Sequence, residues 1–186
     1  MQNTENTKNY SKFFPYPSIR DAQTEAIDFA LDAFLNQNKR FVVLEAGTGV
    51  GKSAIGLTVA RYLNYSLPFL VDGYADGGYF LTTQKILQEQ YMKDFGKPKG
   101  KMKSIKSSSN YTCKFNKANT CADSLRALKV TDKSSRFFKA CAYGCVYKKA
   151  KEEFIASKEG VTNFAYFLAE TQYAGKLLPK NVLVVD

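Results

Sequence analysis

The 186-residue sequence contains no histidine and only four cysteines and five prolines. The absence of histidine excludes Ser-His-Asp and Cys-His catalysis and every histidine-ligated metal site within the chain. No apolar run approaches the roughly 18 residues that a membrane-spanning helix needs, and the first twenty residues lack the apolar core of a secretory signal. We therefore expect an intracellular protein whose chemistry depends on cysteine, carboxylates, lysine, hydroxyls or the backbone.

The positive charge is concentrated in one segment. The chain has a net charge of +10, yet the segment 93–151 alone carries 16 lysines and arginines against three acidic residues, so the remainder is slightly acidic. A local excess of this size is typical of a surface that binds a polyanion, because each neutralised phosphate releases counterions. The alternative is a solvated lysine-rich face that maintains solubility.

All four cysteines lie in the same segment, at Cys113, Cys121, Cys141 and Cys145. Because cytosolic thiols are kept reduced, an even and clustered set favours a metal or iron-sulfur site over disulfides. Four unrelated thiols are the alternative, but these cysteines stand among polar residues rather than in apolar stretches. Only Cys141 and Cys145 are closely spaced, whereas zinc sites prefer two close pairs. The spacing therefore favours an iron-sulfur cluster over Zn²⁺.

Hydrophobic periodicity predicts alternating helices and strands. We expect helices over 21–36, 52–64, 84–95 and 147–157, and strands over 41–44, 79–82 and 181–186. The buried face of the third helix is expected to carry Ile86, Leu87, Tyr91 and Phe95. From 96 to about 139 the periodicity is poor, so we expect an irregular insertion that the cysteines hold together. Alternating strands and helices imply βαβ units, a parallel sheet and an α/β fold.

Residues 46–53, AGTGVGKS, are a variant of the phosphate-binding motif GxxxxGK(S/T) with Ala46 in place of the first glycine. The motif follows an expected strand and opens an expected helix, the context in which it binds nucleoside triphosphates. Lys52 places a charge on the β- and γ-phosphates, and the Ser53 hydroxyl is a magnesium ligand. The residues expected to contact the nucleotide are Gly47, Thr48, Gly49, Val50, Gly51, Lys52 and Ser53.

Asp186 directly follows the last expected strand. Enzymes with a phosphate-binding loop need a carboxylate at the end of a neighbouring strand to hold the magnesium ion. We therefore assign Asp186 to magnesium together with Ser53, and Lys52 and Asp186 to catalysis.

Together these residues resemble the first motor domain of a superfamily 2 DNA helicase of the XPD/DinG type, the iron-sulfur branch. The resemblance extends from about Phe14 to Asp186. Arg20 and Gln23 are similar to the Q motif, which recognises adenine. Further segments follow in the order of the family. Residues 45–53 resemble motif I, and residues 79–90 resemble motif Ia, in which Thr82, Thr83 and Gln90 would contact single-stranded DNA. Residues 110–113 and 141–145 resemble the cluster insertion, 161–163 the segment after it, and 184–186 the start of the DEAH box.

The resemblance implies a RecA-like fold in which helices cover both faces of a parallel sheet. It implies an N-terminal part of the ATP-binding domain over 1–95, a basic iron-sulfur insertion over 96–158 and a return to the domain over 159–186. The implied cofactors are ATP, Mg²⁺ and a 4Fe-4S cluster held by the four cysteines, with Zn²⁺ as the alternative.

The implied activity is ATP-dependent 5′-to-3′ DNA unwinding, with single-stranded DNA and duplex junctions as partners and a role in DNA repair. No membrane partner or oligomer is implied. Since the sequence stops at Asp186, the catalytic glutamate and the second motor domain lie outside it, and we expect the chain alone to be inactive. The alternatives are a nucleotide- and DNA-binding module without turnover, and a zinc-containing ATPase of another type.

Aromatic residues interleave the lysines of the insertion. Two roles remain open for them: stacking on bases, or forming a small core around the cluster. The residues are Tyr111, Phe115, Phe137, Phe138, Tyr143 and Tyr147.

Overall fold

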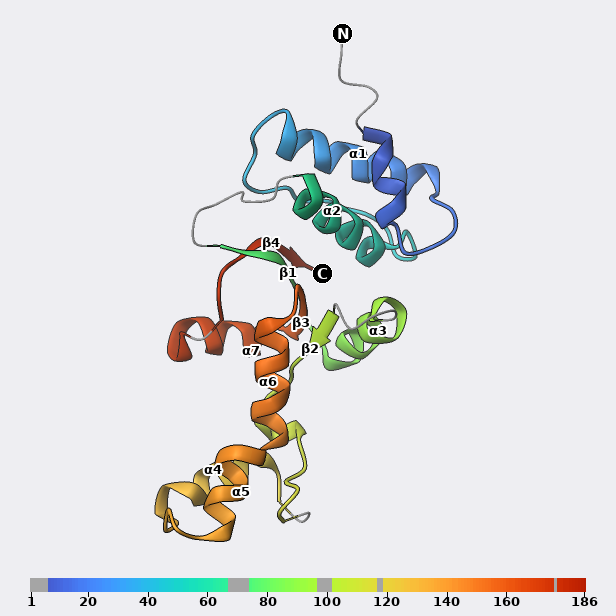
Figure 1. Cartoon of the computed structure of the whole chain (residues 1–186). Coiled ribbons are helices and arrows are strands. Elements are labelled where there is room, and N and C mark those ends of the chain that lie inside the picture. Colours follow the sequence, from blue (N-terminus) through green and yellow to red (C-terminus); the bar gives the residue numbers. More distant parts are fainter. Residues whose placement is uncertain (1–6, 67–73, 97–101, 117–118, 176) are drawn as a thin grey trace. The chain divides into compact units, whose positions relative to one another are not determined.

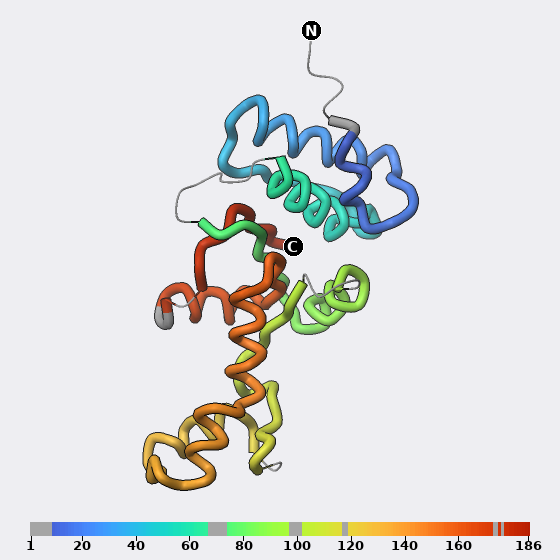
Figure 2. The backbone as a smooth tube through the Cα atoms, viewed as in Figure 1, coloured from blue at the N-terminus to red at the C-terminus, as the bar shows by residue number. Residues whose placement is uncertain are grey.

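The computed structural model describes residues 7–66, 74–96, 102–116, 119–175 and 177–186 (Figures 1 and 2). The chain divides into two compact units, the first comprising Met1–Phe80 with Pro179–Asp186 and the second Leu81–Leu178. In the described parts, no helix is both long and apolar enough to cross a membrane.

The first unit contains a short 3-10 helix, Thr7–Phe13, followed by α1 (Asp21–Leu35) and α2 (Lys52–Ser66). Its strands are β1 (Ala75–Thr82), whose last two residues belong to the second unit, and β4 (Lys180–Val185). Apolar residues at helical spacing bury one face of α1, among them Ile27 and Leu31, whereas the buried residues of α2, among them Ile55 and Leu57, lie on several sides of the helix. Both helices were expected from this periodicity.

The close packing of α2 against β4 positions the start of α2. Gly56 is the residue that permits it, because a Cβ at this position would lie 2.8 Å from Cγ1 of Val184. The N-terminus of α2, where the phosphate-binding motif ends, is thereby held beside the end of β4.

The second unit contains α3 (Lys85–Phe95), β2 (Met102–Ser104) and β3 (Glu159–Asn163). Strands β2 and β3 are parallel, with Lys103 opposite Gly160. The buried Gln88 of α3 donates from Nε2 to the carbonyls of Ile105 at 2.7 Å and Val161 at 3.3 Å, which ties the helix to both strand segments. The sheet order β2-β3-β1-β4 confirms the α/β fold with a parallel sheet.

Between β2 and β3 the chain makes an excursion that returns along α6 (Figure 2). After a 3-10 turn at Ser108–Asn110 it forms α4 (Cys121–Ala127), a second 3-10 turn at Leu128–Val130, α5 (Arg136–Gly144) and α6 (Val146–Ala156). We call residues 105–145 the cysteine lobe. After β3, α7 (Phe164–Ala169) continues into a π-helical turn at Glu170–Ala174.

The expected strand over 41–44 is wrong. The segment has no regular structure, and Phe41 and Val43 are 85% and 88% exposed. An apolar run forms a strand only when a neighbouring strand pairs with its backbone, and no described strand pairs with this one.

Three further expectations need correction. Tyr91 and Phe95 are buried on α3 as expected, but Ile86 is 68% exposed and Leu87 is also exposed, while Gln88 takes the buried position. The insertion is less irregular than its sequence suggests, because helix caps such as Thr120 before α4 and Ser135 before α5 start short helices in it. Strand β4 is only partly buried, since Leu183 and Val185 are exposed.

Candidate functional site

The phosphate-binding motif is a loop that ends at the first residue of α2. Gly49 and Gly51 adopt positive φ angles of 78° and 89°, a conformation that residues with a Cβ rarely adopt. At Gly51 a Cβ would also lie 2.7 Å from Nε2 of Gln23, so a larger residue would displace the Gln23 amide in addition to straining the backbone. The loop curls in front of the α2 N-terminus, where unpaired backbone N–H groups favour an anion.

Lys52 lies at the first position of α2 and is exposed. Its Nζ donates hydrogen bonds to the carbonyls of Ala46 at 3.0 Å and Gly47 at 3.2 Å. The ammonium group is therefore held over the loop, where a bound phosphate would meet it.

Ser53 and Asp186 are 133 residues apart in the sequence, yet the Ser53 hydroxyl donates to a carboxylate oxygen of Asp186. The packing of α2 against β4 creates this contact. Two oxygen ligands of the kind that Mg²⁺ prefers are thus placed together at the start of α2. The two side chains lie together in the first unit, and their coordination of Mg²⁺ stays a prediction.

Arg20 and Gln23 flank the start of α1 and both contact the phosphate-binding loop. Arg20 donates from Nη2 to the carbonyls of Gly49 at 3.0 Å and Val50 at 2.7 Å, and Gln23 donates from Nε2 to Val50 at 2.8 Å. Gln23 also accepts from the backbone N–H of Arg20 at 3.0 Å. The two side chains support the loop backbone, a role that the sequence did not predict, while their contact with adenine stays a prediction.

The expected single-strand contacts lie at the start of the second unit and on α3. Thr83 and Gln90 are exposed. Thr82 is 1% exposed, and its hydroxyl donates to the carbonyl of Gln84 at 3.0 Å. Thr83 and Gln90 are therefore accessible to a ligand, whereas Thr82 shapes the turn before α3.

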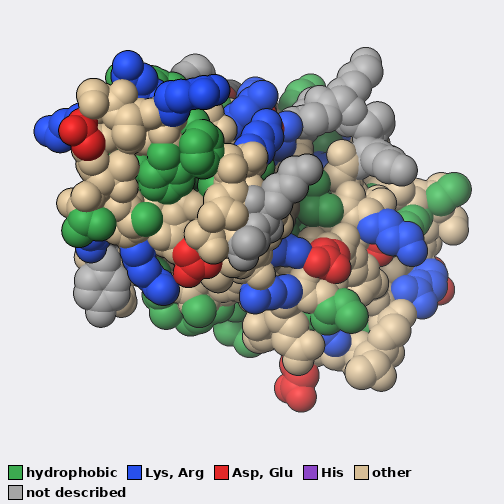
Figure 3. Space-filling view, turned by 90° about the horizontal axis from the view of Figure 1, so that it is seen from below, with side chains coloured by type: hydrophobic (Ala, Val, Ile, Leu, Met, Phe, Trp, Pro, Cys, Tyr) green, Lys and Arg blue, Asp and Glu red, His purple; other side chains and the backbone are tan. Residues whose placement is uncertain are grey.

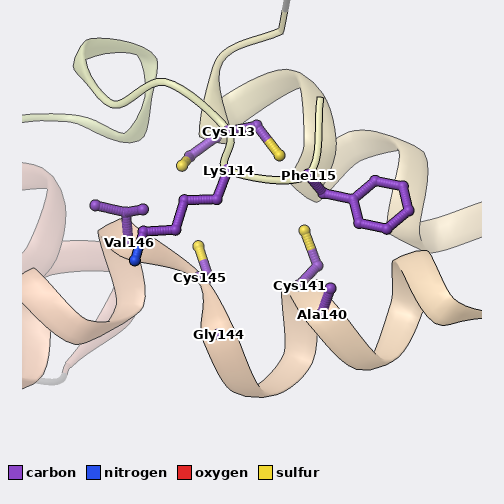
Figure 4. Close-up of a pocket in the computed structure, with 9 residues that line it drawn as sticks. Cys113, Lys114, Phe115, Ala140, Cys141, Gly144, Cys145 and Val146 are labelled. Carbon is purple, nitrogen blue, oxygen red and sulfur yellow. The ribbon is translucent and has the colours of Figure 1, made fainter. Parts of the chain in front are cut away.

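All four cysteines are buried, unpaired by disulfides, and line one cavity of about 270 Å³ in the cysteine lobe. Cys113 comes from the loop before α4, Cys121 begins α4, and Cys141 and Cys145 come from α5 and its C-cap. Figure 4 shows the thiols of Cys113, Cys141 and Cys145 pointing toward a common space. The four cysteines, although irregularly spaced in the sequence, therefore lie around one cavity.

The pKa shifts of the thiols in the cavity run in two directions. Burial alone would raise the pKa of Cys113, but hydrogen bonds from Ser124 and from backbone N–H groups lower it. Burial raises the pKa of Cys141, and the neighbouring Cys113 and Cys145 raise this pKa further. Burial likewise raises the pKa of Cys121, with Cys145 and Cys113 adding to the effect. Several thiolates in one buried site repel one another unless a cation compensates them.

Among the described residues, no group of three or more cysteine or carboxylate side chains stands in the geometry that holds a metal ion. The four thiols line the cavity of about 270 Å³ together with Lys114, Phe115 and three small or apolar residues.

Ser124 is a polar residue of this region that the sequence did not single out. It lies one turn after Cys121 on α4 and is 1% exposed, and its side chain is among the groups whose hydrogen bonds lower the pKa of Cys113. The signal available in the sequence was its i,i+3 spacing from Cys121, which places both residues on one helix face. A buried hydroxyl of this kind is suited to donate to a sulfur atom.

The basic segment has two kinds of cations. Several pair with acidic side chains: Lys103 lies 2.9 Å from Glu153, and Lys106 and Lys151 pair with Glu89 and Glu170. Others are exposed without an ion pair inside the described ranges, including Lys114, Lys129, Lys133, Arg136, Lys139 and Lys149. In Figure 3 the lysines and arginines form separate groups over the visible face rather than one continuous patch.

The aromatic residues of the segment divide between the two roles left open above. Tyr111 packs against Tyr147 with ring centroids 5.5 Å apart, and Phe115 packs against Phe137 at 5.3 Å. Tyr111 and Tyr147, both partly buried, contribute to a small core, whereas Phe115 is 54% exposed despite its contact with Phe137. Tyr143 is 90% exposed and is free to contact a ligand.

Comparison with family models gives one match, to the family described as type III restriction enzyme, res subunit, over residues 16–171. The matched range includes Arg20, the phosphate-binding loop and all four cysteines, and it ends before β4. Comparison with curated proteins finds no match.

Proposed function

Because the chain belongs to the type III restriction enzyme res subunit family, a motor domain of the superfamily 2 helicase type, we propose that it is the ATP-binding part of a DNA helicase. The proposed activity is 5′-to-3′ translocation of the XPD/DinG iron-sulfur type. The observation that carries the ATP site is the hydrogen bond between Ser53 and Asp186, which joins the phosphate-binding loop to the last strand.

In this proposal the loop binds the triphosphate. Its backbone N–H groups and the start of α2 hold the phosphate oxygens, and Lys52 neutralises the charge on the β- and γ-phosphates. Ser53 and Asp186 would hold Mg²⁺, which bridges the same phosphates and offsets the charge that develops during transfer. Arg20 and Gln23 keep the loop in its curled conformation through its carbonyls at Gly49 and Val50.

We propose that the cysteine lobe holds an iron-sulfur cluster, with a single zinc ion as the alternative. The donor set supports a thiolate-bound centre, because four buried thiols line one cavity. Cys113, Cys121, Cys141 and Cys145 would hold the cluster. When bound, the group would cross-link α4, α5 and the loop that carries Cys113.

Nucleic acid is the proposed polymeric partner. The exposed cations of the segment 93–151 provide phosphate contacts, and Thr83 and Gln90 are accessible at the start of the second unit. ATP binding would change the affinity of these groups for single-stranded DNA.

The cluster is tested by measuring iron, acid-labile sulfide and zinc in protein purified without oxygen. We expect iron and sulfide in comparable amounts and a broad absorption near ~400 nm. Stoichiometric zinc in a colourless preparation would instead support the zinc-containing alternative and contradict the XPD/DinG assignment. ATP binding, measured on the same preparation, is expected in either case because the nucleotide site lies in the first unit.

A further inference from the structure

Helix α5 has two faces of different chemistry. Ala140, Cys141 and Gly144 line the cysteine cavity. Arg136, Lys139 and Tyr143 follow i, i+3, i+7 spacing and therefore lie along a second face of the same helix. All three are exposed, Tyr143 to 90%.

The second face has no partner inside the described part of the chain. None of these three side chains makes a hydrogen bond, ion pair or ring contact with a described residue. The nearest acid along the chain, Asp132, accepts hydrogen bonds from the backbone N–H of Ser134 and caps that turn. Two cations and one aromatic ring thus remain available to a ligand.

From this arrangement we propose that the Arg136-Lys139-Tyr143 face of α5 binds single-stranded nucleic acid. Arg136 and Lys139 contact consecutive phosphates, and Tyr143 stacks on an unpaired base. The inference rests on the proposed helicase function and assigns one contact surface to it.

The combination favours a single strand over other anionic partners. An acidic protein surface would neutralise the two cations but would leave no role for a fully exposed tyrosine. A duplex keeps its bases stacked inside the helix, whereas a single strand offers base faces to an aromatic ring and phosphates to neighbouring cations.

The test measures binding of the full chain to a fluorescein-labelled oligothymidylate by anisotropy at several salt concentrations. Tyr143→Ala is expected to weaken binding roughly tenfold, in line with the loss of one base stack, while Tyr143→Phe stays within about twofold. Arg136→Ala and Lys139→Ala are each expected to make the negative slope of log K against log[salt] less steep by about 0.7, as one lost phosphate contact does on a single strand.

An oligomer of the same length without bases separates the two kinds of contact. Tyr143→Ala is expected to leave binding of this abasic probe unchanged, whereas Arg136→Ala and Lys139→Ala weaken it. Matched controls are Lys158→Ala, an exposed cation between α6 and β3, and Phe29→Ala, an exposed ring on α1. Both controls are expected to bind like the unaltered chain.

The outcomes distinguish this inference from the function on which it rests. If the unaltered chain binds the oligonucleotide and the α5 variants bind it equally well, the surface is wrong and the helicase proposal stands. If Tyr143→Ala weakens binding of the abasic probe as strongly as binding of the oligothymidylate, Tyr143 does not stack on a base. If the unaltered chain binds ATP but no oligonucleotide, the nucleic-acid part of the proposed function fails as well.

Discussion

Lys52→Ala is expected to weaken ATP binding roughly 100-fold. Hydrogen bonds to a charged group contribute about 1.5–3 kcal/mol each, and the Lys52 ammonium is the cation held over the loop by the carbonyls of Ala46 and Gly47. The dissociation constant is measured by isothermal titration calorimetry with ATP and Mg²⁺.

The matched control for this variant is Lys39→Ala. Lys39 is an exposed lysine of the first unit that lies in the turn after α1, outside the phosphate-binding motif 46–53. We expect its ATP affinity to stay within about twofold of the unaltered chain. Equal ATP affinity in Lys52→Ala would show that the motif does not bind the triphosphate in the proposed way.

Cys141→Ala is expected to unfold the cysteine lobe while leaving the nucleotide site intact. The helices that the structure describes in the lobe are short, so an inorganic centre that joins its segments would supply much of its stability, as metal binding does in small metal-dependent domains. We expect loss of bound iron and at least a roughly tenfold faster cleavage within residues 105–145 in limited proteolysis. ATP affinity should change by less than about twofold, because Cys141 lies in the second unit.

The control for the lobe is Val130→Ala, which removes an apolar side chain that is 90% exposed in the same lobe. Its cleavage pattern and iron content should match those of the unaltered chain. Unchanged iron content in Cys141→Ala would remove Cys141 from the ligand set. Loss of iron without faster cleavage would show that the lobe folds independently of the centre.

Local signals in the sequence predicted the phosphate-binding loop and the helix that follows it. Three glycines, Lys52 and Ser53 stand in a motif whose backbone geometry is nearly fixed by its residues. The periodicity of the apolar residues predicted α1, α2, α3 and α6, because apolar residues recur in them at the spacing of a helix. The Ser53–Asp186 contact followed from the rule that a strand-terminal carboxylate accompanies such a loop.

Features that depend on distant partners were not predictable in the same way. The segment 41–44 has a strand-type sequence, but strand formation requires a neighbour that a local pattern does not contain. Gln88 occupies a buried position because carbonyls from two distant segments accept its hydrogen bonds. Ser124 and the exposed α5 face became visible only when the short helices of the lobe were placed around the cavity.

The most direct test of the account is an ATP titration of the chain and of Asp186→Asn, each with Mg²⁺ and with a chelator. The account predicts that the unaltered chain binds ATP at least roughly tenfold more tightly when Mg²⁺ is present, and that Asp186→Asn loses most of this difference. Equal affinities with and without Mg²⁺ in the unaltered chain, or a full magnesium effect in Asp186→Asn, would contradict the assignment of Ser53 and Asp186 as the magnesium site.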